Sequence, residues 1–140
     1  MEKNEFFIAT PVGTSMMPMI RERIDTVKLV RVTRKLQKYD VILYERPDQT
    51  YVLHRIVGVK KQKDKEFYIL CGDNQTALER NVLVSQVIAV MEGYYRGEEY
   101  INNTNASYMR YAKRRVRSRK WRKMRSFFGR IYHMIFKRKK

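Results

Sequence analysis

Positive charge is distributed very unevenly along this chain of 140 residues. Residues 1–100 hold 16 Lys or Arg against 14 Asp or Glu, a balance of +2, whereas residues 101–140 hold 15 basic residues and no acidic one. Long blocks of like charge repel one another and are typical of interaction tails. We therefore expect one folded domain with a modest core at residues 1–100 and a basic tail at residues 101–140.

Short runs rich in β-branched and aromatic residues follow one another through the first part of the chain. Turn-forming residues separate them, such as Pro47-Asp48 between two strand-like runs. This pattern predicts a mainly β domain, with the first run buried and the third covered on both faces. The runs are Phe6–Ala9, Val27–Val32, Asp40–Glu45, Tyr51–Lys60, Phe67–Cys71 and Val82–Met91.

Cysteine usage and hydropathy narrow the class of protein. Cys71 is the single cysteine, which excludes an internal disulfide. The sequence has no apolar run of about 18 residues, and residues 1–5 lack the layout of a secretory signal. We expect no spanning helix, no cofactor and no metal.

Ser15 is the candidate nucleophile. It lies between Gly13 and Pro18, where the backbone turns sharply. A serine hydroxyl is a weak nucleophile and needs a general base. His54 can be that base: the strand period of two places it on one face with Val52 and Ile56, and an imidazole with a pKa near 6.5 is mostly neutral at pH 7. Taken singly, a turn serine is more often a backbone cap and a strand histidine more often a satisfied core residue.

Four sequence boxes in order resemble the type I signal peptidase superfamily of serine proteases. They are the Gly-x-Ser-Met-x-Pro box at Gly13–Pro18, the Asp-hydrophobic strand at Asp40–Tyr44, the base box at His54–Gly58 and the Gly-Asp-Asn box at Gly72–Asn74. The resemblance covers roughly residues 6 to 95 and implies an antiparallel β domain. It also implies endoproteolytic removal of signal or leader peptides from exported proteins.

The base position distinguishes two kinds of enzyme within this superfamily. Most bacterial members place Lys there, whereas the endoplasmic-reticulum and SipW-like forms place His, so this chain resembles the second kind through His54. Those enzymes orient the histidine with a carboxylate, and the resemblance leaves two candidates. Asp73 lies in the Gly-Asp-Asn box and is expected to be structurally required, while Glu79 stands where the His-type enzymes carry Asp. Arg55 is expected to point away from the base and to pair with a carboxylate.

The remaining site residues flank the serine. Backbone N–H groups at the turn, that of Ser15 first and that of Gly13 second, are expected to stabilise the oxyanion. Met16 and Met17 are expected to pack around the substrate groove. Type I signal peptidases usually carry a spanning helix before the serine box, so membrane attachment here is expected to come from elsewhere.

The basic tail supplies a candidate for that attachment. Apolar residues recur in it at spacings of three and four, which trace one stripe of a helix, with Lys and Arg on the other faces. This pattern is typical of a helix lying on an anionic membrane surface and predicts a peripheral protein on the cytoplasmic side. A nucleic-acid partner, a protein partner or a disordered arm remain alternatives. The predicted membrane-binding residues are Trp121, Phe128, Ile131 and Ile135.

A second function class also fits a small basic β protein. The chain resembles the SOS-repressor-type proteases, whose β domain is related, and it would then be a non-enzymatic or self-cleaving regulator with a nucleic-acid-binding tail. Three features disfavour this alternative: His54 in place of their Lys, no helix-turn-helix pattern and no Ala-Gly cleavage pair. The peptidase is the favoured interpretation.

Overall fold

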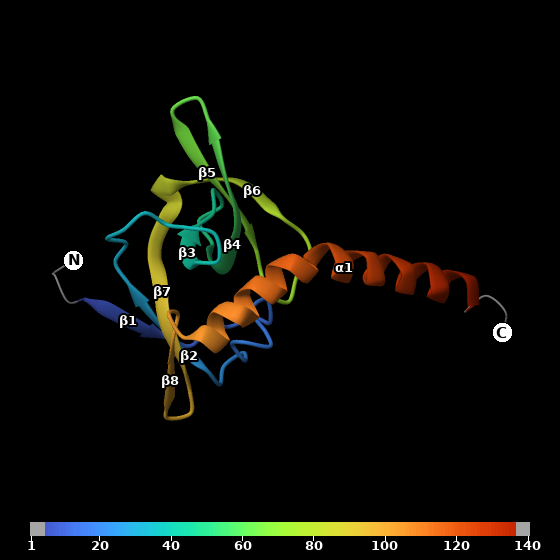
Figure 1. The fold of residues 1–140 in the computed structure, drawn as a ribbon, viewed down its shortest axis with the longest axis horizontal. Helices are drawn as coiled ribbons and strands as arrows, with labels where there is room; N and C mark the ends of the chain where they lie inside the picture. The colour runs from blue at the N-terminus through green and yellow to red at the C-terminus, as the bar shows by residue number, and fades with distance from the viewer. Residues whose placement is uncertain (1–4, 137–140) are drawn as a thin grey trace.

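The computed structural model describes residues 5–136, which form an eight-stranded antiparallel sheet and one C-terminal helix (Figure 1). The predicted mainly β class is confirmed, and so is the antiparallel arrangement that the resemblance implied. Residues 1–4, part of the segment expected not to be a secretory signal, and residues 137–140 of the tail lie outside the described residues. The elements are β1 (Phe6–Ala9), β2 (Thr26–Val30), β3 (Val41–Glu45), β4 (Tyr51–Gln62), β5 (Lys65–Cys71), β6 (Glu79–Leu83), the short 3₁₀ helix η1 (Val84–Gln86), β7 (Val87–Arg96), β8 (Glu99–Asn102) and α1 (Ala106–Phe136).

Tight turns set the register of the central strands. In the sheet the order is β1-β2-β7-β3-β4-β5-β6, with β8 paired to β7. The β3–β4 turn closes where the Arg46 N–H donates to the Thr50 carbonyl at 2.8 Å, and Asp48 accepts from the Thr50 N–H at 3.1 Å. The turn predicted at residues 46–50 is therefore confirmed, and it fixes the pairing of Ile42 with His54.

The core lies on both sides of the sheet. One cluster includes Met16, Val27 and Val41, and the other includes Ile42 and Tyr44. Because consecutive residues of β3 point to opposite faces, Val41 enters one cluster and Ile42 the other. The prediction that this strand is covered on both faces is confirmed.

Two strand predictions need correction. Strand β1 has the predicted bounds, but its side chains are exposed, Phe6 by 53%, because the strand pairs only with β2 at the edge of the sheet. The run Val82–Met91 is not one strand: η1 separates β6, which pairs with β5, from β7, which pairs with β2 and β3. The Gln86 side chain holds this break by accepting from the Leu83 N–H and donating to the Glu45 carbonyl.

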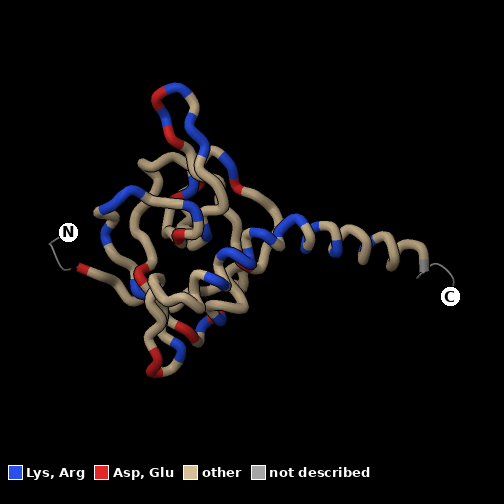
Figure 2. Tube along the Cα trace, viewed as in Figure 1, with Lys and Arg blue, Asp and Glu red and all other residues tan. Residues whose placement is uncertain are grey.

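Helix α1 begins after Asn105, whose side chain accepts from the Ser107 N–H at 2.8 Å and caps the first turn. Its first turns lie against the sheet, and its distal half extends away from the domain (Figure 1). Tyr108 and Ala112 are buried, so the first turns of the helix, which lie beyond the boundary predicted at residue 100, contribute to the core. The folded domain includes the first turns of the helix, and the basic residues are spread along it (Figure 2).

Candidate functional site

The serine turn is held against the Gly-Asp-Asn box. The Asn74 N–H donates to the Ser15 carbonyl at 2.8 Å, and the Asn74 side-chain amide donates to the Thr14 carbonyl at 3.1 Å. Gly72 is in van der Waals contact with the same turn, since a Cβ added there would lie 2.6 Å from the Ser15 carbonyl oxygen and 3.0 Å from the Ser15 Cβ. Two of the four sequence boxes therefore meet in space.

The base box joins them through the register of the sheet. Arg55 of β4 pairs with Cys71, the last residue of β5, so continuing the same register by one position would set Gly72 opposite His54. Residues directly opposite one another in an antiparallel pair point to the same face, with Cβ atoms about 5 Å apart. Ser15 packs where a Cβ of Gly72 would lie, so the serine turn is next to the end of β5, one residue beyond the partner of Arg55. Within the described part of the chain, no hydrogen bond joins the hydroxyl to the imidazole.

His54 is buried, with 5% of its surface exposed. Its Nδ1 lies 3.4 Å from the Tyr44 hydroxyl and 3.8 Å from a carboxylate oxygen of Glu79. Burial lowers the pKa of His54 to about 4, although the nearby Glu79 carboxylate opposes that shift. The imidazole is therefore neutral at pH 7, and its pKa is lower than the ordinary value expected from the sequence.

The Tyr44 hydroxyl connects the imidazole to the carboxylate. It donates its only proton to Glu79, so at His54 it can act only as an acceptor. This arrangement favours the tautomer with a proton on Nδ1 and a lone pair on Nε2. Every fully buried side-chain N or O atom in residues 5–136 has a hydrogen-bond partner, whereas Nε2 has none and therefore reaches the surface. Nε2 is the nitrogen that is free to accept a proton.

Glu79 is fixed as an anion. Arg46 binds it with two hydrogen bonds, at 2.9 and 3.0 Å. Burial alone would raise the pKa of Glu79, but the hydrogen bonds from Arg46 and Tyr44 outweigh it and lower that pKa. Of the two carboxylates predicted from the sequence, Glu79 is the one beside His54.

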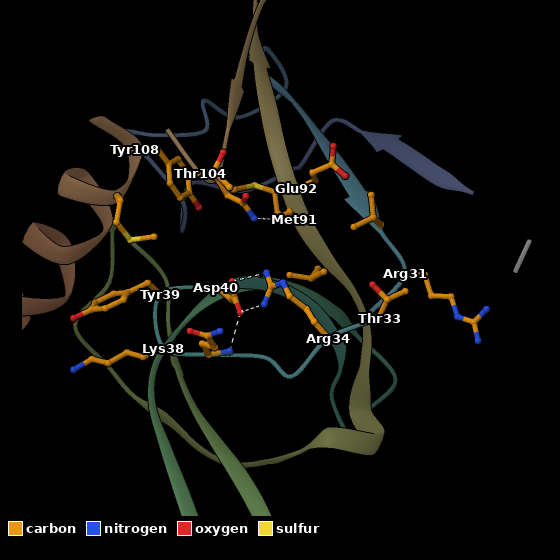
Figure 3. A pocket seen from close by; sticks show the side chains of 15 residues that line it. Arg31, Thr33, Arg34, Lys38, Tyr39, Asp40, Met91, Glu92, Thr104 and Tyr108 are labelled. Carbon is orange, nitrogen blue, oxygen red and sulfur yellow. Dashed lines mark hydrogen bonds and ion pairs between the residues drawn. The ribbon is translucent and has the colours of Figure 1, made fainter. Parts of the chain in front are cut away.

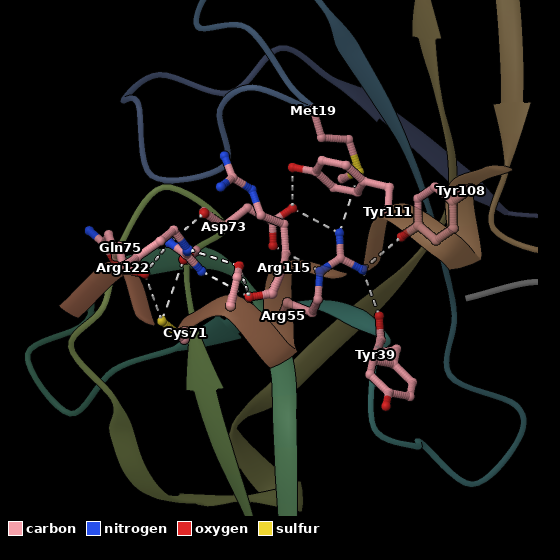
Figure 4. A network of polar contacts seen from close by, with 12 residues as sticks. Met19, Tyr39, Arg55, Cys71, Asp73, Gln75, Tyr108, Tyr111, Arg115 and Arg122 are labelled. Carbon is pink, nitrogen blue, oxygen red and sulfur yellow. Dashed lines mark hydrogen bonds and ion pairs between the residues drawn. The ribbon is translucent and has the colours of Figure 1, made fainter. Parts of the chain in front are cut away.

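Asp73 has a different neighbourhood (Figure 4). Its carboxylate accepts two hydrogen bonds from Arg55, at 2.8 and 2.9 Å, and a third from the Tyr111 hydroxyl at 3.0 Å. The prediction that Arg55 points away from the base and pairs with a carboxylate is confirmed. Asp73 is buried in this pair and makes no hydrogen bond to His54, so its position fits the structural role and not the orienting one.

The helix contributes to the same region, which sequence reasoning missed. The Arg55 guanidinium donates to the Tyr108 hydroxyl at 3.2 Å. From the next turns of α1, Arg119 donates to the Thr76 carbonyl at 2.7 Å, and Arg122 donates to the Asp73 and Gln75 carbonyls at 3.1 and 2.9 Å. The sequence did contain a signal for this packing: Tyr108, Tyr111 and Ala112 have the spacings of three and four that place residues on one face of a helix.

A groove of about 730 Å³ opens beside His54. Its walls come from three parts of the chain: the strands that carry His54 and Glu79, the turn after β5, and helix α1. No group of His, Cys, Asp and Glu within residues 5–136 is arranged to hold a metal ion. The residues that carry charge or chemistry in these walls are Arg46, His54, Asn74, Glu79, Arg115 and Arg122.

Of the residues predicted to bind the oxyanion or to line the groove, some have positions that fit these roles and others do not. The Gly13 N–H donates to the Glu22 carboxylate at 3.0 Å and is not available to an oxyanion in this arrangement. The Ser15 N–H has no acceptor within the described residues and remains the candidate donor. Met16 is buried in the core with 3% exposure, so it does not line an open groove as predicted, whereas Met17 is half-buried at the turn.

The distal part of α1 carries the predicted apolar residues on its surface. Trp121, Phe128 and Ile135 are exposed by 60%, 59% and 51%, while Ile131 is half-buried. The helix predicted from the spacing is confirmed, and Gly129 is accommodated within it. Within residues 5–136, no helix is long and apolar enough to cross a bilayer.

A second cavity, of about 430 Å³, lies between the β2–β3 connection, β7 and the start of α1 (Figure 3). None of the predicted site residues lines it. Two acidic residues line it: Asp40 is bound by Arg34 at 2.8 and 2.9 Å and by the Gln37 N–H at 2.8 Å, and Glu92 accepts from Lys28 at 3.0 Å. Both carboxylates of this cavity are therefore already in ion pairs.

Comparison of the chain with family models, with curated proteins and with solved structures yields no match. The function of the chain is therefore inferred from the positions of Ser15, His54 and Glu79 and from the groove that His54 and Glu79 line.

Proposed function

We propose that the protein is a serine-type endopeptidase, with Ser15 as the nucleophile, His54 as the general base and Glu79 as the carboxylate that orients it through Tyr44. The observation that carries this proposal is the packing of Ser15 on Gly72, which directly follows Cys71, the cross-strand partner of Arg55 next to His54. Side chains at a distance of one cross-strand pair can meet after a rotamer change.

In the proposed reaction the Ser15 hydroxyl attacks the carbonyl carbon of a peptide bond while its proton moves to Nε2 of His54. The Ser15 N–H stabilises the oxygen that becomes negative. His54 then gives the proton to the leaving amine, and a water molecule hydrolyses the acyl-enzyme by the same path in reverse. The Glu79 carboxylate stabilises the imidazolium that forms in both halves of the reaction.

The resemblance to the type I signal peptidase superfamily supports a substrate class. We propose that the substrates are signal or leader peptides, cut after small residues and delivered at a membrane surface. The exposed Trp121 and Phe128 on a helix rich in Lys and Arg support peripheral binding of that helix to anionic lipids.

Mass spectrometry of peptides incubated with the wild type and with Ser15→Ala tests the proposal. The wild type is expected to produce cleaved peptides that the variant does not. Ser85→Ala is the matched control, since Ser85 is exposed in η1 and belongs to no wall of the groove. Equal cleavage by the wild type and Ser15→Ala would contradict the proposal.

A further inference from the structure

Helix α1 presents two cations to the groove that contains His54. Arg115 and Arg122 are seven positions apart, which is close to two helical turns, so they lie on one face of the helix. Both line the groove. The opposite wall carries Arg46 and Glu79, which neutralise one another at 2.9 Å. The net positive charge of the groove therefore comes from the two arginines of the helix.

Neither helical cation has an acidic partner. Within residues 5–136, no carboxylate forms an ion pair with Arg115 or Arg122. The donors of Arg122 are directed to neutral acceptors, namely the Asp73, Gln75 and Arg115 carbonyls and the Ser118 hydroxyl. Burial, and after it repulsion from Arg115, lowers the pKa of Arg122.

Arg115 hydrogen-bonds the Tyr111 hydroxyl, and since a guanidinium group has five N–H donors, others remain for a ligand. Its guanidinium carbon lies 6.0 Å from the Tyr111 ring centroid, where the ring supports the guanidinium group by a cation–π contact. Tyr111 is in turn held by its hydrogen bond to Asp73 at 3.0 Å. A guanidinium group in such a position has a planar set of N–H groups suited to a carboxylate.

We propose that Arg115, with the field of Arg122 behind it, forms a subsite for an acidic side chain of the peptide substrate. This inference rests on the proposed function, because it makes the groove beside His54 the substrate site. It adds a preference that the resemblance to signal peptidases does not contain: an Asp or Glu at a fixed position relative to the cut bond.

A binding experiment tests this preference without needing cleavage. The protein is full-length Ser15→Ala, and the probes are short alanine-rich peptides with one Asp at successive positions, together with the matching Asn series. At low salt we expect at least one Asp peptide to bind about tenfold more tightly than its Asn counterpart. Its binding should shift the backbone amide resonances of residues 75–78, which line the groove.

Charge-matched variants separate this subsite from the general positive charge of the protein. Arg115→Gln should remove the tenfold preference, whereas Arg114→Gln, on an exposed position that does not line this groove, should keep it. Equal affinity for Asp and Asn peptides, or a preference that survives Arg115→Gln, would overturn the subsite. Binding with the expected preference but no cleavage by the wild type would refute the proposed peptidase and leave the acidic subsite intact.

Discussion

Gly72 and Ser15 are packed so closely that a methyl group on the glycine would lie 2.6 Å from the serine carbonyl oxygen. The backbone of Gly72 does not have a positive φ, so the glycine is required here for close approach and not for its turn conformation. This contact holds the serine turn against the end of β5, the strand that pairs with β4.

Gly72→Ala should therefore push the serine turn away from His54 and lower kcat/KM for peptide cleavage by about a hundredfold. Gly58→Ala is the control, because its added Cβ would meet only the Ile69 side chain at 3.4 Å, an ordinary contact. Kinetics of both variants, with circular dichroism to confirm folding, make the measurement. A folded Gly72→Ala protein with wild-type activity would show that the contact does not position the serine.

The pH dependence follows from the pKa of His54, which burial lowers from 6.5 to about 4. Neutral imidazole is the active form, so activity should remain nearly constant from pH 8 to pH 5 and fall by half near pH 4. The pH profile of kcat/KM checks this, alongside an NMR titration of the imidazole. A midpoint at pH 6 to 7 would mean that His54 is more hydrated than the structure shows.

The same shift makes folding depend on pH. Between pH 6.5 and about pH 4 the unfolded chain takes up a proton that the folded protein does not, so the free energy of unfolding falls as pH decreases. The loss from His54 alone is about 3 kcal/mol over this range. The contribution of His54 is the difference between the free energies of unfolding in urea of the wild type and of His54→Gln, measured at each pH. If His54 is not buried, this difference should not change with pH.

Tyr44→Phe should affect the chemistry more than the fold. Removing the hydroxyl leaves Nδ1 of His54 without its acceptor, so we expect kcat to fall by about a hundredfold with little change in KM. Tyr68→Phe is the matched control, since Tyr68 is buried in the same core cluster but does not contact His54. Equal losses in the two variants would indicate a general packing effect and remove Tyr44 from the site.

Truncation separates the two parts of α1. A chain ending at Arg122 keeps Tyr108, Ala112 and the contacts of Arg122 with the turn after β5, so it should fold and cleave small peptides but lose binding to anionic liposomes. A chain ending at residue 105 loses core residues and should not fold. Liposome sedimentation and circular dichroism make the test, and unchanged sedimentation of the shorter helix would dismiss the membrane role of residues 123–136.

Much of the sheet could be predicted because its signals are local. The turn at residues 46–50 and the alternation along β4 depend on neighbouring residues, and they correctly separated His54 from Arg55. The exposure of Phe6 could not be predicted, because a short apolar strand has the same sequence pattern at an edge as in the centre of a sheet. The break at η1 was missed since it depends on Gln86 reaching the distant Glu45 carbonyl.

In the candidate site, too, some residues could be named from the sequence, whereas the roles of others depend on tertiary contacts. Ser15 and His54 could be named from the sequence boxes, and Glu79 from its place after the last box. The choice between Asp73 and Glu79 depends on which guanidinium each carboxylate faces, and that is a tertiary property. Tyr44 gave no signal of its own, because a tyrosine in a strand is common. The role proposed for Arg115 depends on how the helix packs on the domain. The number of basic residues in the tail does not indicate which of them faces the groove.

The central claim is that Ser15 and His54 act as one unit, and a double-mutant cycle on cleavage tests it most directly. If they do, Ser15→Ala, His54→Ala and the double variant should have nearly the same residual kcat, because removing either group already abolishes the proton transfer. If the two losses instead multiply, so that the double variant is slower than either single variant by the full product, the two residues act independently and the proposed pair is wrong.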